Sequence, residues 1–252
     1  MDAFQTFQSA SSAYSAAESG FGYDSLKDFR QISPAVQSHL KLVYLTLCVA
    51  LAASAVGAYL HVAWNIGGML TLIGCLSSIS ILGGTPVHEE RKRFGLLLAA
   101  ALLEGASIGP LIKFAVDFDP RILVTAFIGT AIVFGCFTGA AMVAKRREYL
   151  YLGGMLSSGL SVLLWLPVAS SIFGHSLGFM FEVYFGLLIF LGYMVYDTQE
   201  IIERAHQGDM DYIMHALTLF TDFVAVFVRI LLITLKNASD KEEDKKRRRR
   251  SS

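Results

Sequence analysis

Two aspartates stand in stretches of sequence that are otherwise apolar. Asp197 lies in LLIFLGYMVYDTQEII, residues 187–202, and Asp222 lies in ALTLFTDFVAVF, residues 216–227. A charged side chain near the middle of a bilayer costs roughly 2.5–3.5 kcal/mol on insertion scales, so such a residue usually faces a cavity or a partner. We therefore expect both aspartates to serve a function rather than to fill space.

The sequence between these aspartates predicts that they face each other. Gly208 is suited to end one helix and Asp209 to cap the next. Asp197 precedes Gly208 by about three helical turns, and Asp222 follows Asp209 by slightly more than that. In an antiparallel hairpin both carboxylates would then lie roughly 16–20 Å from the turn, at about 1.5 Å per residue.

Two carboxylates at one depth in a medium of low dielectric constant would share a proton and titrate as a unit. When deprotonated, their oxygens are suited to calcium, although two side chains give too few ligands for tight binding. We predict that Asp197 and Asp222 form a pH sensor and a weak calcium site on a permeation path. In the alternative interpretation, each aspartate satisfies only a helix end or a neighbouring hydroxyl.

Two further charged residues lie within predicted spans. Arg229 follows Asp222 by about two helical turns and projects from a similar helix face, so it is a candidate counter-ion for a deprotonated aspartate. Its alternative role is packing or reaching the interface near the end of its segment. Glu104 is a second auxiliary candidate.

The sequence does not favour an enzyme. Tyr196 before Asp197 matches one motif of aspartyl intramembrane proteases, but LFTD at Asp222 lacks their Gly-x-Gly-Asp and no Pro-Ala-Leu follows. His88-Glu89-Glu90 lacks a second histidine at the spacing of one helical turn, so it does not predict a zinc site. We expect no enzymatic activity, no cofactor and no nucleic-acid partner.

The elements that must position these residues are membrane-spanning helices. Hydrophobic residues make up 54% of the 252-residue chain, and charged residues gather in short runs between long apolar stretches. Crossing the hydrocarbon needs about 20 apolar residues. We predict an all-α bundle with about seven spans, at residues 40–61, 64–84, 94–116, 121–144, 149–173, 179–202 and 211–236.

Small residues and cysteines lie within these spans. Gly105 with Gly109, and Gly135 with Gly139, are spaced for close helix packing. Cys48, Cys75 and Cys136 are an odd number within apolar stretches, so we expect small core residues rather than disulfides. The expected domains are a polar segment at 1–39, a membrane domain at 40–236 and a basic tail at 237–252.

Lysine and arginine in short loops predict a cytosolic N-terminus, because Arg91–Arg93 and Lys145–Arg147 then lie inside. Seven complete crossings would put the basic tail on the opposite side, against the same rule. Either the last segment enters and returns, or it spans and the tail is an exception. A cytosolic tail is favoured. No cleaved signal peptide is expected at residues 1–39.

The C-terminal run GYMVYDTQEIIERAHQGDMDYIMHALTLFTDFVAVFVRIL resembles the signature of the Bax inhibitor family, the transmembrane Bax inhibitor motif proteins. The blocks FGLLLAAALLEGASIGPLI, TAFIGTAIVFGCFT and KRREYLYLGGMLSSGLSVLL resemble it in the same order, so the match covers about residues 30–236. The basic tail is most like that of plant-type members.

The resemblance implies a seven-helix bundle around a central helix, in the endoplasmic-reticulum membrane, that suppresses programmed cell death. It also implies pH-sensitive calcium leak and a link to calcium homeostasis and the unfolded-protein response. The family's paired aspartates fall on Asp197 and Asp222. In bacterial relatives an arginine of the second helix latches one of these acids; Arg91 and Arg93 are the nearest candidates, and the role stays unassigned.

The resemblance further implies that the tail binds calmodulin, and a basic run beside a membrane also attracts anionic lipid. The tail residues concerned are Lys245, Lys246, Arg247, Arg248, Arg249 and Arg250. A competing hypothesis is a non-conducting scaffold that regulates cell-death partners through this tail. Oligomeric state and protein partners are not predicted.

Overall fold

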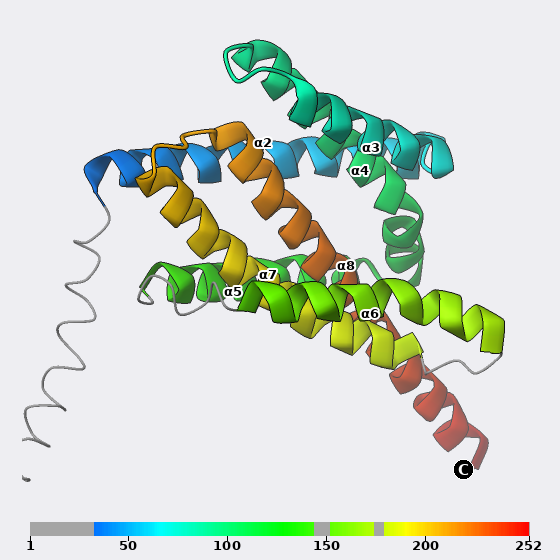
Figure 1. Cartoon of the computed structure of the whole chain (residues 1–252). Coiled ribbons are helices and arrows are strands. Elements are labelled where there is room, and N and C mark those ends of the chain that lie inside the picture. Colours follow the sequence, from blue (N-terminus) through cyan, green and yellow to red (C-terminus); the bar gives the residue numbers. More distant parts are fainter. Residues whose placement is uncertain (1–32, 144–151, 174–178, 252) are drawn as a thin grey trace, which may run out of the picture.

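The structure, a computed structural model, describes residues 33–143, 152–173 and 179–251. These residues form helices joined by short connections, without a strand (Figure 1). In chain order the helices are α2 (Pro34–Trp64), α3 (Met69–Gly84), α4 (Glu90–Phe118), α5 (Pro120–Val143), α6 (Leu152–Phe173), α7 (Phe179–His206) and α8 (Tyr212–Ser251). Each of the seven predicted segments thus contains a helix in its described part.

Five of these helices, α2, α4, α5, α7 and α8, are long and apolar enough to cross a membrane. The two others are shorter apolar helices: α3 has 16 residues, and the apolar part of α6 covers Leu152–Leu166. The predicted fold class, a helical integral membrane bundle, is confirmed. The chain is therefore a multi-pass membrane protein.

Helix α8 is the central helix, and it carries Asp222. It packs against α2, α4, α5 and α7, and more of its apolar window is buried than in any other candidate span of the described residues. Its core side chains include Ala216, Leu219 and Val226, each at most 1% exposed. Figure 1 shows α8 passing through the bundle and projecting from it at its C-terminal end.

Two helix boundaries differ from the predicted ones. Helix α2 begins at Pro34 rather than near residue 40, because Pro34 suits the first helical turn and the Ser33 hydroxyl accepts the Val36 N–H at 3.4 Å. Helix α8 runs on to Ser251, since residues 212–251 contain neither glycine nor proline. The alternative in which the last segment enters and returns is wrong, because α8 never turns back.

Helices α2 and α4 approach so closely that side chains are excluded at their contact. A Cβ built on Gly57 would collide with the backbone carbonyl of Leu102, and one on Gly105 with that of Ser54. The predicted packing role of Gly105 is confirmed. Gly135 and Gly139 of α5 do not share it, because a Cβ at either position would meet no described atom within 4 Å.

The difference between Gly105 and Gly135 predicts that a change from glycine to alanine affects the stability of the protein differently at the two positions. Gly105→Ala is expected to lower the free energy of unfolding by up to about 2 kcal/mol, since overpacking costs about 1–3 kcal/mol and the gain in helix propensity returns about 1 kcal/mol. Gly135→Ala gains propensity without a collision and should be neutral or stabilising. Denaturant titration in mixed micelles measures both; equal losses would contradict the close contact.

The outward faces of the bundle are apolar, as a hydrocarbon environment requires. Leu70, Leu164 and Leu188 are between 66% and 84% exposed. The prediction that all cysteines are core residues is wrong for two of the three. Cys75 is buried, whereas Cys48 of α2 and Cys136 of α5 are exposed, because an apolar sequence does not reveal which face of a helix points outward in a membrane.

Candidate functional site

The carboxyl groups of Asp197 in α7 and Asp222 in α8 lie close enough to interact with each other. Asp222 is only 5% exposed, and Asp197 is half-buried. One carboxylate oxygen of Asp222 is buried without a hydrogen-bond partner among the described residues. The structure therefore brings together the two acids that the turn offsets predicted to meet. Two carboxyl groups can hydrogen-bond to each other only when one of them carries a proton.

The turn that aligns the pair ends α7 in the predicted way. Gly208 has a φ of +96°, its N–H donates to the Ala205 carbonyl at 3.3 Å, and the Asp209 N–H donates to the Arg204 carbonyl at 3.0 Å. This is the Schellman pattern, in which a glycine takes the left-handed position. Residues beyond Gly208 are thereby directed back along α7.

The predicted cap of α8 falls on the wrong aspartate. The Asp211 carboxylate, not that of Asp209, accepts the Met214 N–H at 3.1 Å, while Asp209 accepts the Asp211 N–H at 3.2 Å. Asp222 lies as far after Asp211 in the sequence as Asp197 lies before Gly208. The shift therefore improves the match in depth between the two acids.

Polar groups of α7 surround the more accessible end of the pair. Tyr193 interacts electrostatically with both acids, and Glu200 and Arg204 interact with Asp197. Arg204 donates to Glu200 at 2.6 Å, close to the C-terminal end of α7. Asp197 thus lies between the charged end of α7 and the more buried Asp222.

Arg229 is not placed as a counter-ion of Asp222. Its Nη1 donates to the Ala225 carbonyl of its own helix at 2.9 Å, and its guanidinium lies over the Phe190 ring, 4.2 Å from the centroid. The nearby acid that acts on it is Glu182. The contacts of Arg229 are therefore with Phe190 and its own helix rather than with the aspartate pair, and they fit the alternative role in packing.

Glu104 is also separated from the pair. It is half-buried in α4 and lies close enough to the Cys75 thiol of α3 to interact with it. This contact joins α3 to α4, so the predicted auxiliary role beside the aspartates is not supported by its position.

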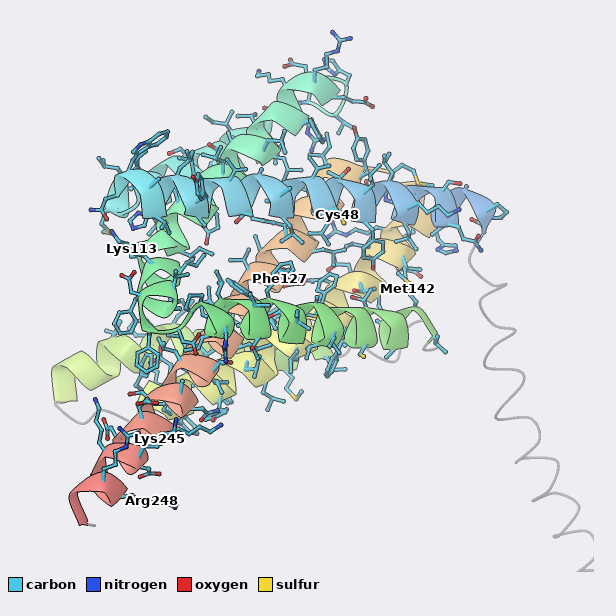
Figure 2. The ribbon with its side chains drawn as sticks, turned by 180° about the vertical axis from the view of Figure 1, so that it is seen from behind. Cys48, Lys113, Phe127, Met142, Lys245 and Arg248 are labelled. Atoms are coloured by element: carbon cyan, nitrogen blue, oxygen red, sulfur yellow. The ribbon has the colours of Figure 1, made fainter. Side chains whose placement is uncertain are left out.

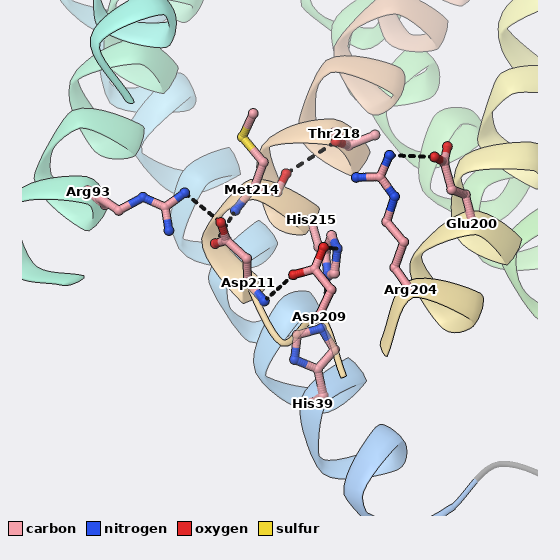
Figure 3. Close-up of polar contacts among 9 residues, drawn as sticks. All are labelled: His39, Arg93, Glu200, Arg204, Asp209, Asp211, Met214, His215 and Thr218. Carbon is pink, nitrogen blue, oxygen red and sulfur yellow. Dashed lines mark hydrogen bonds and ion pairs between the residues drawn. The ribbon is translucent and has the colours of Figure 1, made fainter. Parts of the chain in front are cut away.

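Arg93 forms a buried ion pair with a different acid. Its Nη2 lies 2.6 Å from Oδ2 of Asp211, with the two side chains only 4% and 15% exposed (Figure 3). Arg91, the other latch candidate, is exposed. Partial burial raises the pKa of Asp211, but the Arg93 guanidinium and the Met214 N–H outweigh it, so the pKa lies below its ordinary value of 3.8. Arg93 therefore ties α4 to the first residue before α8.

Sequence reasoning missed a histidine pair beside this ion pair. His39 of α2 and His215 of α8 share a hydrogen bond of 2.9 Å between Nε2 and Nδ1, and both are buried. Asp209 approaches the other nitrogen of His215 at 3.9 Å. The two histidines lie at opposite ends of the membrane domain in the sequence, so no local motif connects them. The only sequence signal for the pair is that each histidine lies near one end of an apolar span. Figure 3 shows α2, α4 and the α7–α8 turn converging here.

The basic tail extends α8 as an exposed helix. Figure 2 shows Lys245 and Arg248 at its projecting end. Lys245 pairs with Glu242 at 3.2 Å, and Lys236 with Asp240 at 2.7 Å. The side chain of Arg250, like Lys145–Arg147 of the predicted cytosolic loop, lies outside the described residues. Among the described residues, no cluster of three or more His, Cys, Asp or Glu is arranged to hold a metal.

Comparison with known proteins adds a family to this geometry. Residues 36–240 match the family described as Inhibitor of apoptosis-promoting Bax1. The chain is 82% identical to Bax inhibitor 1 of Oryza sativa subsp. japonica over 252 residues, all of both chains. It is 68% identical to Bax inhibitor 1 of Arabidopsis thaliana, covering 96% of this chain and 97% of the relative. Bax inhibitor 1 of Homo sapiens is 42% identical, with 89% and 96% covered.

Proposed function

The chain belongs to the Bax inhibitor family, and from this premise we propose that it suppresses programmed cell death in the endoplasmic-reticulum membrane through a pH-sensitive calcium leak. In this proposal Asp197 and Asp222 form the gate, calcium is the permeant ion, and no enzymatic step or cofactor takes part. The N-terminus is cytosolic. Stress-linked calcium homeostasis, including the unfolded-protein response, would follow from control of this leak.

The contact between the two carboxyl groups supports the proposal most strongly. In this proposal the pair shares one proton, carries one negative charge and holds α7 against α8. Loss of that proton leaves two carboxylates facing each other in a medium of low dielectric constant, where they repel each other and attract a hard cation. Proton binding and calcium passage therefore compete at one place.

Calcium flux into liposomes across a range of pH tests this function. Asp222→Asn is expected to lower the flux by about tenfold or more and to flatten its pH response, which corresponds to at least about 1.4 kcal/mol of lost stabilisation of the ion. Asp197→Asn should act in the same direction. The leak proposal fails if Asp222→Asn leaves both the flux and its pH response unchanged.

Glu104→Gln is the matched control. It makes the same change from acid to amide within a span, but Glu104 contacts Cys75 of α3 rather than the pair. Its flux and pH response should equal those of the unsubstituted chain. An equal loss in all three variants would trace the effect to general damage of the bundle.

A second candidate function rests on the projecting end of α8. The exposed helix with Lys245–Arg249 is suited to calmodulin or to anionic lipid, and through it the protein would act as a non-conducting scaffold for cell-death partners. Removing residues 237–252 is expected to leave calcium flux in liposomes unchanged, because the acid pair lies within the bundle. Calmodulin binding measured on the same variant should be lost.

Cell-death assays on the shortened chain separate the two functions. Protection retained without the tail counts against the scaffold. If the shortened chain no longer protects cells from death but still passes calcium, the calcium leak is not the protective activity.

A further inference from the structure

A cavity of about 480 Å³ lies between α2, α4, α5 and α8, all of them candidate spans. Of its fifteen lining residues, only Ser54 and Tyr59 carry a polar side chain. The volume is within the range of small-molecule sites, roughly 300–1,000 Å³. A wall this apolar offers a water molecule too few hydrogen-bond partners, so the cavity favours a hydrocarbon group over water.

The cavity has a buried floor and an exposed mouth. Phe223, Val224 and Phe227 of α8 form part of the floor and are 5–7% exposed. Tyr59 of α2 and Phe127 of α5 stand at the mouth and are 70% and 50% exposed. The mouth therefore opens between α2 and α5 toward the surface that faces lipid, where Figure 2 places Phe127 between neighbouring helices.

Aromatic packing fixes the inner wall. The Phe127 ring lies 6.1 Å from that of Phe223 and 6.5 Å from that of Phe227, both in edge-to-face contact. Such contacts hold the rings in defined positions. The wall is thus a preformed surface shared by α5 and the central helix.

The length of the α2 wall of the cavity matches that of one lipid acyl chain. Its α2 wall runs from Leu51 to Val62, which is about 16 Å at 1.5 Å per residue. Half of the hydrocarbon core, the depth of one leaflet, is about 15 Å. Tyr59 lies near the C-terminal end of α2, and tyrosines favour the membrane interface. A chain that enters there and ends beside Leu51 spans one leaflet.

We propose that this cavity is a binding site for one acyl chain of a membrane phospholipid, which enters between α2 and α5 and lies against Phe223 and Phe227. The site is independent of the proposed calcium leak. It requires only that α2, α4, α5 and α8 lie in the bilayer.

Photolabelling of the full chain in phosphatidylcholine nanodiscs tests the site. The probe is a phosphatidylcholine with a diazirine in one acyl chain, and mass spectrometry locates the label. We expect label on Phe223, Val224 and Phe227, buried residues that line the cavity. Label confined to outward-facing residues would overturn the proposal.

Two tryptophan variants make the test specific. Ala55→Trp adds bulk at the exposed rim and should lower the label on α8 by about tenfold, equivalent to about 1.4 kcal/mol. Val56→Trp adds the same side chain at the next position, which is exposed and outside the cavity, and should leave the label unchanged. Equal labelling of α8 in both variants contradicts the site.

Competition decides which lipid occupies the cavity. Excess unlabelled phosphatidylcholine should remove the α8 label from the unsubstituted chain. Displacement by a sterol or a free fatty acid, but not by phosphatidylcholine, would overturn the assignment to a phospholipid chain.

Discussion

Arg93→Met is expected to lower the free energy of unfolding by about 3–5 kcal/mol, because it leaves the Asp211 carboxylate partly buried without its partner. Arg93 is 4% exposed and its Nη2 lies 2.6 Å from Asp211. Methionine fills much of the volume that the arginine stem occupies, so the loss reflects charge rather than a cavity. Denaturant titration in mixed micelles measures it.

Lys92→Met is the matched control on the neighbouring residue. Lys92 pairs with Glu89 at 3.0 Å, but its side chain is 59% exposed, and ion pairs in water contribute only about 0–1 kcal/mol. Combining Arg93→Met with Asp211→Asn should recover part of the loss, since asparagine keeps the cap of α8 without the orphaned charge. A loss as small as that of Lys92→Met would show that the buried pair contributes little.

The pH dependence of this pair has a definite sign. The pKa of Asp211 in the folded protein lies below its ordinary value of 3.8, so the contribution of the ion pair is complete above 3.8. It is lost as pH falls through the lower, folded value. The difference between the unsubstituted chain and Arg93→Met should therefore be constant near neutral pH and shrink only below about pH 3.8.

Asp222→Asn is expected to raise the free energy of unfolding by about 1–3 kcal/mol, the opposite of its effect on calcium flux. Asp222 is 5% exposed, faces a second acid and has one oxygen without a described partner. Asparagine donates a hydrogen bond to the Asp197 carboxylate without needing a shared proton, and it buries no charge. The same micelle titration gives the value.

Asp240→Asn controls for the substitution itself. Asp240 lies on the same helix and pairs with Lys236, but both side chains are 51% exposed, so a change below about 1 kcal/mol is expected. If Asp222→Asn instead destabilises the protein as Arg93→Met does, the aspartate pair is a structural contact and its role in a gate is lost. If Asp222→Asn makes the protein more stable but lowers calcium flux, Asp222 is retained for function rather than for stability.

The features that were predictable from the sequence are those encoded locally. Apolar runs of sufficient length predicted every helix of the described residues. The distances of Asp197 and Asp222 from one turn predicted that they meet, because an α-helix has a fixed rise per residue. Even the error in the cap of α8, Asp209 for Asp211, is local. Both are aspartates suited to capping, and only the three-dimensional turn decides between them.

The features that were not predictable depend on which helix faces join. Arg93 and Asp211, like His39 and His215, are far apart in the sequence, and no pattern in the chain connects them. The orientation of Arg229 toward Phe190 has the same cause. In lipid both faces of a helix are apolar, so hydrophobic periodicity carries little information about the side that packs.

Helix α8 joins the acid pair to the basic tail without a break, and this continuity has a mechanical consequence. From Asp222 to Lys245 the helix measures about 35 Å, with no glycine or proline to act as a hinge. It is a continuous rod whose longer part, with core residues from Ile213 to Leu235, lies in the bundle and whose shorter C-terminal part projects from it. A protein or a membrane surface that binds the tail would therefore transmit force along α8 to Asp222, which faces Asp197.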